Sequence, residues 1–183
     1  KNKLIKFYGE TALSRNGAVA SLNALQLTPV SYFSLLLLYR YYDKRYQAFF
    51  GNAFSQNSAV RNEQGMYMGM QWMPFARWKL SAYADIFRFP WLRYGVDMPS
   101  TGKECMLQLD YTPSRNLSVY VRYKYKQKEN IGPYRQQRLR MQALYAVSSS
   151  VSLRTSADGI GYTETNEKSR GWMIAQSVGW KPV

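Results

Sequence analysis

Alternation of apolar and polar residues restricts this chain to β-structure more than any other feature of its sequence. The pattern is clearest in residues 77–88, 103–111, 116–128 and 138–147. In the first of these segments, every second side chain is apolar: Trp78, Leu80, Ala82, Ala84 and Ile86. Side chains alternate every two residues in a strand but every 3.6 in a helix, so these segments predict strands. Weaker versions of the pattern bring the expected number to ten strands, at 3–14, 17–27, 31–42, 64–73, 151–158 and 168–181.

The connections between the expected strands alternate in length. Short turns with Pro, Ser or Asn are expected near 28–30, 74–77, 112–116 and 148–150. Longer loops, polar or glycine-bearing, are expected near 51–63, 88–102, 129–134 and 159–167, with a further turn at 15–17 on the same side. The spacing predicts one β-domain, residues 1–183, in which antiparallel strands follow one another as an up-and-down meander.

Composition excludes several classes of protein. The 183 residues include no His and one Cys, so an imidazole-dependent site and a disulfide within the chain are both excluded. Hydrophobic residues make up 46% of the chain, which is too much for a disordered segment. No apolar run approaches the ~18–20 residues that a membrane-spanning helix needs, whereas the ~9–11 residues of a transmembrane β-strand remain compatible with the sequence.

Two architectures suit such a meander: a soluble β-barrel or sandwich, and a transmembrane β-barrel. The strands are longer than the usual 5–6 residues, and one face is highly charged. Aromatic residues gather near the expected strand ends, as in the aromatic girdles of membrane barrels: Tyr39, Tyr41, Tyr42, Trp72, Phe75, Trp78, Tyr111, Tyr123, Tyr125, Trp172 and Trp180. We therefore expect an all-β, porin-like transmembrane barrel in a bacterial outer membrane, in contact with lipid or lipopolysaccharide. The alternative is a soluble, basic β-protein that binds nucleic acid.

Two segments resemble a family of Bacteroidota outer-membrane β-barrel proteins. The segments are Phe-Phe-Gly-Asn-Ala-Phe-Ser at 49–55 and Gln-Trp-Met-Pro-Phe-Ala-Arg-Trp-Lys-Leu-Ser-Ala-Tyr-Ala-Asp at 71–85. Members of that family are longer and carry helix-hairpin-helix motifs upstream of the barrel. The resemblance implies a barrel fold, an outer-membrane location and a chain that is a segment of a larger barrel. It implies no activity and no site residue.

Basic residues gather on one face of the later strands. The formal net charge of the chain is +14. Six cations are expected to form a continuous basic wall: Arg122, Lys124, Lys126, Arg138, Arg140 and Arg154. Carboxylates are expected on the earlier strands instead, at Asp85, Glu104 and Asp110. In a barrel this separation predicts a lumen with a transverse field, suited to passage or docking of anionic material. The alternative interpretations are that the wall neutralises an acidic plug or a partner subunit from the outer membrane or periplasm, or is only hydrated.

No residue pattern indicates an enzyme, a cofactor or a metal site. Glu104 and Asp110 are six residues apart on one strand, about 20 Å, which is too far for an acid–base pair. Nucleic acid is not expected as a partner, because Tyr123 and Tyr125 lie on the face opposite Arg122 and a stacking surface needs both on one face. A second candidate surface is the loop near 88–102, where four residues suggest docking of a carbohydrate or protein: Arg88, Trp91, Arg93 and Tyr94.

Overall fold

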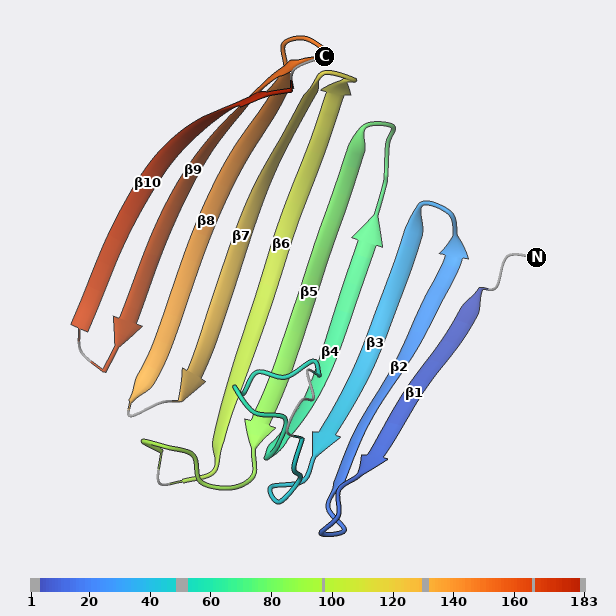
Figure 1. The fold of residues 1–183 in the computed structure, drawn as a ribbon, viewed down its shortest axis with the longest axis vertical. Coiled ribbons are helices and arrows are strands. Elements are labelled where there is room, and N and C mark those ends of the chain that lie inside the picture. Colours follow the sequence, from blue (N-terminus) through green and yellow to red (C-terminus); the bar gives the residue numbers. More distant parts are fainter. Residues whose placement is uncertain (1–3, 49–52, 97, 130–131, 166, 182–183) are drawn as a thin grey trace.

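A computed structural model of the chain describes residues 4–48, 53–96, 98–129, 132–165 and 167–181, and these form one β-sheet of ten antiparallel strands (Figure 1). The strands follow one another in sequence order across the sheet: β1 (Ile5–Leu13), β2 (Val19–Val30), β3 (Phe33–Tyr42), β4 (Glu63–Trp72), β5 (Trp78–Phe89), β6 (Ser100–Ser114), β7 (Leu117–Glu129), β8 (Pro133–Ala146), β9 (Val151–Glu164) and β10 (Glu167–Trp180). The all-β, up-and-down meander predicted from the alternation is therefore confirmed.

The sheet is open rather than closed into a barrel. Within the described residues, β1 pairs with β2 alone and β10 with β9 alone, so both strands lie at free edges (Figure 1). Closure would require the two edge strands to pair, yet β1 has nine residues and β10 has fourteen. The ten strands of this chain thus form a sheet and not a complete barrel by themselves.

The strands run further into two of the expected turns than the sequence suggests. The turn expected at 28–30 is displaced to 31–32, because β2 continues through Pro29 with a shift of register between Leu27 and Val30. The turn expected at 112–116 is shortened to 115–116, with a register shift between Tyr111 and Ser114. Proline cannot donate a hydrogen bond to a neighbouring strand, and both prolines are accommodated in these irregular positions. The turns expected at 74–77 and 148–150 lie in the connections 73–77 and 147–150.

The prediction of a long loop at 159–167 is wrong. Gly159 and Gly161 suggested a loop, but β9 continues to Glu164 and pairs residue by residue with β8 on one side and β10 on the other. Backbone hydrogen bonding to two neighbours overrides the weak strand preference of glycine. The loops expected near 51–63, 88–102 and 129–134 lie in the connections 43–62, 90–99 and 130–132. Residues 49–52, 97 and 130–131 of these connections lie outside the described part.

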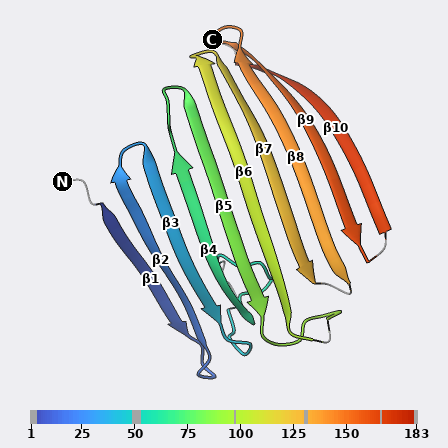
Figure 2. The same ribbon diagram turned by 180° about the vertical axis from the view of Figure 1, so that it is seen from behind.

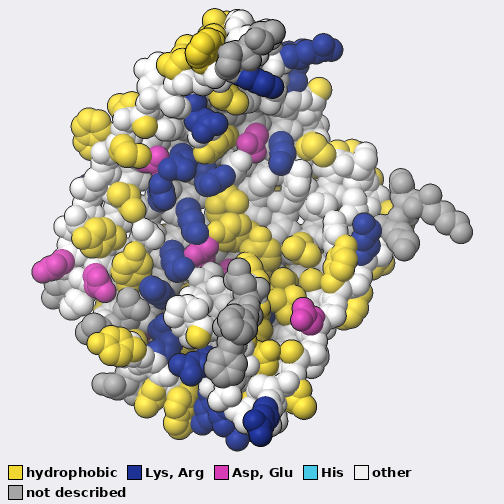
Figure 3. Space-filling view, in the orientation of Figure 1, with side chains coloured by type: hydrophobic (Ala, Val, Ile, Leu, Met, Phe, Trp, Pro, Cys, Tyr) yellow, Lys and Arg dark blue, Asp and Glu magenta, His cyan; other side chains and the backbone are white. Residues whose placement is uncertain are grey.

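The two faces of the sheet differ in chemistry. The polar face carries ionic side chains that the register brings into rows, among them Arg40, Asp85, Glu104, Lys126, Arg138 and Asp158. Figure 3 looks onto this face and shows Lys and Arg side chains following the middle of the sheet, with carboxylates among them. The connection between β3 and β4 crosses in front of the strands in Figure 1 and lies behind them in the reverse view of Figure 2.

The opposite, apolar face is uncovered. Across this face, from β1 to β10, large apolar side chains are about 40–80% exposed, including Phe7, Met68, Ile86, Leu107, Met141, Trp172, Ile174 and Trp180. Among the described residues, the buried apolar side chains are few and lie elsewhere: Ala18, Ala20, Ala24, Tyr42, Phe87, Phe89 and Val96. Several charged side chains on the polar face are buried instead. The described residues include no helix long and apolar enough to cross a lipid bilayer.

Candidate functional site

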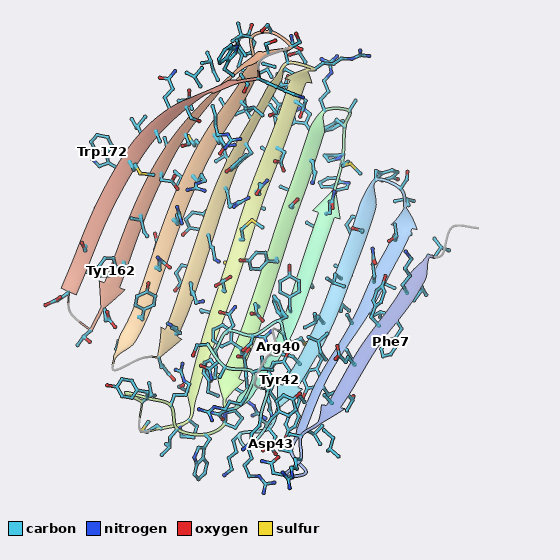
Figure 4. All side chains as sticks on the ribbon, in the orientation of Figure 1. Phe7, Arg40, Tyr42, Asp43, Tyr162 and Trp172 are labelled. Carbon is cyan, nitrogen blue, oxygen red and sulfur yellow. The ribbon has the colours of Figure 1, made fainter. Side chains whose placement is uncertain are left out.

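A loop folds back onto the polar face and forms the centre of the site. We call its described part, residues 53–62, the inner loop. The Gln56 side-chain amide donates a hydrogen bond to Asp85 Oδ2 (2.8 Å) on β5. The ring of Phe54 packs edge-on against Tyr67 of β4, with ring centroids 5.3 Å apart. These contacts hold the inner loop against the sheet instead of leaving it in solvent, and Figure 4 shows Arg40 and Tyr42 where it crosses.

Beneath the inner loop lies a buried ion cluster formed by Arg40, Glu63 and Asp85. Arg40 is fully buried and donates through Nε to Glu63 Oε1 (2.6 Å) and through both Nη atoms to Asp85 (2.8 and 3.1 Å). Such a two-pronged arginine–carboxylate contact is among the stronger ion pairs in proteins. The cluster contains two carboxylates and one cation, so it carries one net negative charge when all three groups are ionised.

Hydrogen bonds from the inner loop satisfy the remaining carboxylate oxygens of the ion cluster. Glu63 accepts the Ser55 hydroxyl (2.6 Å) and the backbone amides of Gln56 and Asn57 (2.9 Å each to Oε2). A buried charge costs free energy unless it is paired and hydrogen-bonded, and here each carboxylate has several donors. The ion cluster and the inner loop therefore depend on each other: the loop provides donors, and the cluster fixes the loop's position.

Gly65 makes room for the arginine. It is paired with Arg40 across β3 and β4, and a Cβ atom placed on it would overlap Arg40 Cζ and lie 2.6 Å from Nη2. Contacts this short do not occur in folded proteins, so any larger residue forces the guanidinium to move. The absence of a side chain at position 65 is thus a requirement of the ion cluster.

Replacing Gly65 with Ala is expected to displace Arg40 and weaken both carboxylate contacts. We expect a loss of about 1–3 kcal/mol in the free energy of unfolding, the usual cost of adding a methyl group to a tightly packed site. Denaturant unfolding followed by tryptophan fluorescence would measure it. Gly159→Ala is the matched control, because no atom lies within 4 Å of a Cβ placed there. An equal loss in both variants would contradict the role of Gly65.

The basic wall assembles much as its spacing predicts. The pairing of β7 with β8 sets Arg122 opposite Arg140 and Lys124 opposite Arg138, all on the polar face. Like charges directly opposite in a sheet repel each other, so the wall needs anions between its members. Arg154 is exposed and pairs with Leu144, away from the other five cations towards the 147–150 turn.

Two carboxylates supply those anions. Glu104 lies between Lys124 Nζ (2.8 Å) and Lys126 Nζ (3.1 Å), and it also accepts the Tyr83 hydroxyl (2.6 Å). Asp158 Oδ1 accepts from Arg138 Nη2 (3.0 Å) and Arg140 Nε (2.7 Å). Asp110 accepts the Gln108 amide, and Gln108 in turn accepts from Arg122 Nε (2.6 Å).

The acidic and basic residues are therefore interleaved and not divided between two halves of the sheet. The expected transverse field requires carboxylates on the earlier strands alone, whereas Asp158 on β9 lies within the wall and Glu104 contacts it directly. Pairing of opposite charges across adjacent strands is the physical reason. The five neighbouring wall cations against these two carboxylates still leave three positive charges in excess.

The four residues of the 88–102 loop do not form one docking patch. Arg88 donates to Gln64 (2.7 Å), next to it on the apolar face. Arg93 Cζ lies 3.8 Å from the centroid of the Phe89 ring, and Arg93 Nη2 donates to the Ser100 hydroxyl. Burial of this guanidinium lowers the pKa of Arg93 below its ordinary value. Trp91 and Tyr94 remain exposed, and Lys44 Nζ lies 3.4 Å from the centroid of the Trp91 ring. The expected combination of aromatic rings flanked by free arginines is therefore absent from this loop.

Sequence reasoning missed the ion cluster. The alternation singles out Asp85 but neither Arg40 nor Glu63, and it does not place Asp158 within the wall. One signal was available: an arginine in the otherwise apolar segment 33–42, on a strand expected to pair with the one containing Gly65. Across the described residues, no group of three or more His, Cys, Asp or Glu is placed to hold a metal ion.

Comparison with known proteins assigns no family to the chain: no protein-family model matches it, and no curated protein sequence matches it.

Proposed function

We propose that this chain is part of the wall of a non-enzymatic β-barrel in a bacterial outer membrane, with its apolar face towards lipid and its polar face towards a lumen. The observation that carries the proposal is the distribution of burial. Charged side chains are buried on one face, while large apolar side chains are exposed over the other. A soluble protein has the reverse arrangement and seldom exposes an apolar surface of this extent.

The height of the exposed apolar surface supports the same proposal. On β10, Trp172 and Trp180 are 80% and 74% exposed and bracket Ile174 and Val178. The interval from one tryptophan to the other covers nine residues, close to the ~9–11 that a tilted strand needs to cross a bilayer. Aromatic residues at both borders are typical of membrane barrels.

Stacking of Trp78 on Tyr111, with centroids 4.2 Å apart, extends one border to β5 and β6. In this proposal, further strands close the barrel at the free edges of β1 and β10. The resemblance of residues 71–85 to a Bacteroidota outer-membrane family supports such a larger barrel; residues 49–52 of the other similar segment lie outside the described part.

The basic wall gives the lumen a chemistry suited to anionic material or to an acidic partner subunit. Its excess of positive charge is what an anion pathway or docking surface requires. The alternative, a soluble nucleic-acid-binding protein, has less support. Tyr123 lies on the apolar face, and of the tyrosines on β7 only Tyr120 lies on the polar face near Arg122, with the guanidinium 5.2 Å from the ring centroid.

Cys105, the single cysteine of the chain, provides a direct test. It is exposed on the apolar face, between Ala84 and Tyr125 of the neighbouring strands. If that face meets lipid, Cys105 in isolated membranes should resist a water-soluble maleimide, because the reagent does not enter the apolar interior of the bilayer. Mass spectrometry of the protein before and after detergent denaturation would measure the labelled fraction.

A matched control places the thiol in a loop. Tyr94 is fully exposed, so the variant that combines Cys105→Ser with Tyr94→Cys should label rapidly in the same membranes. Equal and rapid labelling of both proteins would refute the membrane proposal. It would favour the soluble alternative, in which the apolar face meets water.

A further inference from the structure

One side chain of the inner loop connects β5 and β7 across the polar face. The side chain of Gln56 donates to Asp85 on β5 (2.8 Å) and accepts from Lys126 Nζ on β7 (2.7 Å). These two contacts attach the loop on both sides of β6, and the buried ion cluster fixes it from below. The inner loop is therefore fixed in position on the polar face by these contacts.

The charges beside the inner loop are unevenly distributed. The carboxylates of Glu63 and Asp85 are fully buried and engaged by Arg40, so the net negative charge of the ion cluster lies beneath the inner loop and is not accessible from the open side. On the other side of the loop, Lys124 and Lys126 are 40% and 22% exposed and share the single carboxylate of Glu104. These two lysines are the accessible charges beside the loop, and they outnumber the one carboxylate that they share; the net negative charge of the ion cluster is buried.

We propose that the inner loop is a fixed constriction of the lumen, and that Lys124 and Lys126 make this constriction selective for small hydrated anions such as chloride or phosphate. This inference rests on the proposed barrel. A local excess of positive charge in a narrow, partly desolvated passage raises the concentration of anions there and repels cations. The polar atoms that Gln56 and Ser55 contribute to the loop are uncharged and do not oppose this effect.

Ion selectivity tests the role of the two lysines. The natural protein that contains this chain would be inserted into a planar bilayer, and the reversal potential measured across a KCl gradient. The double variant Lys124→Gln/Lys126→Gln should lower the ratio of chloride to potassium permeability by roughly threefold or more. An unchanged reversal potential would overturn the inference.

The matched control removes two positive charges from the other face at the same level. Lys103 and Arg135 are exposed, and they pair with Gln127 from the two neighbouring strands. Gln127 follows Lys126 on β7, so all three side chains lie on the face opposite Lys126. The variant Lys103→Gln/Arg135→Gln should leave the permeability ratio unchanged. A loss as large as that of the lysine variant would attribute selectivity to net charge and would also overturn the inference.

Conductance tests the constriction separately. The triple variant Arg40→Met/Glu63→Gln/Asp85→Asn removes the charges to which the inner loop is attached, so the loop should loosen and single-channel conductance should rise. Unaltered conductance would contradict a constriction at this loop. A protein that conducts no ions in any form, yet protects Cys105 from the maleimide, would overturn this inference and leave the membrane proposal intact; rapid labelling of Cys105 would remove the membrane proposal itself.

Discussion

Replacing Arg40 with Met is expected to lower the free energy of unfolding by about 3–5 kcal/mol, the range found when one partner of a buried ion pair is removed. Arg40 is fully buried, as are Glu63 and Asp85, so the substitution leaves two carboxylates without a cation in a site that water does not reach. Met retains most of the aliphatic volume, so that the loss reports the charge and not a cavity. Urea unfolding of the detergent-solubilised protein, followed by tryptophan fluorescence, would measure the change.

Two further variants make this result interpretable. The Arg45 side chain is exposed, and its Nε lies 3.7 Å from Asp43 Oδ1, so Arg45→Met should cost under ~1 kcal/mol, as is usual for surface ion pairs. The triple variant Arg40→Met/Glu63→Gln/Asp85→Asn should recover much of the loss, because it removes the unpaired charges together with the arginine. Equal stability of Arg40→Met and Arg45→Met would show that the ion cluster does not stabilise the fold.

The strands could be predicted because their pattern is local. In residues 77–88 the alternation alone assigned each side chain to a face, and the register of β4, β5 and β6 agrees with that assignment. The errors occur where backbone pairing overrides local preference. Gly159 and Gly161 have little strand propensity, yet they lie between two paired strands. Pro29 and Pro113 remain within strands because a register shift accommodates each of them.

The candidate site divides in the same way. Most of the basic wall follows from alternation and sequential pairing, since Lys124 and Arg138 need only adjacent strands to meet. The ion cluster instead depends on a loop that folds back over the sheet, and no periodic pattern encodes that path. Arg40, Glu63 and Asp85 come from three different strands, and the donors from Ser55 and Gln56 belong to the loop. Charge neutralisation within the wall also depends on register, which placed Asp158 beside Arg140.

The second large effect concerns the apolar face. Ala157 lies between Met141 of β8 and Ile174 of β10, which are 47% and 66% exposed. If this face meets the hydrocarbon core, Ala157→Arg should destabilise the membrane-inserted protein by about 2–4 kcal/mol, the cost of an arginine on the lipid face near the bilayer midplane. Since alanine is small, the substitution creates no cavity, and Ala157→Leu serves as a control for added volume.

The neighbouring residue provides the contrast that decides the orientation of the sheet. Ser156 precedes Ala157 on β9 and lies on the polar face, paired with Gln142 and two residues from Asp158. In a hydrated lumen, Ser156→Arg should change stability by under ~1 kcal/mol, because the new cation meets water and a carboxylate. Refolding yield in lipid vesicles and the heat-dependent shift of the folded band on a denaturing gel would compare the variants. If Ala157→Arg is harmless and Ser156→Arg disrupts the fold, the apolar face meets water, because an arginine tolerated beside Met141 and Ile174 requires solvent there.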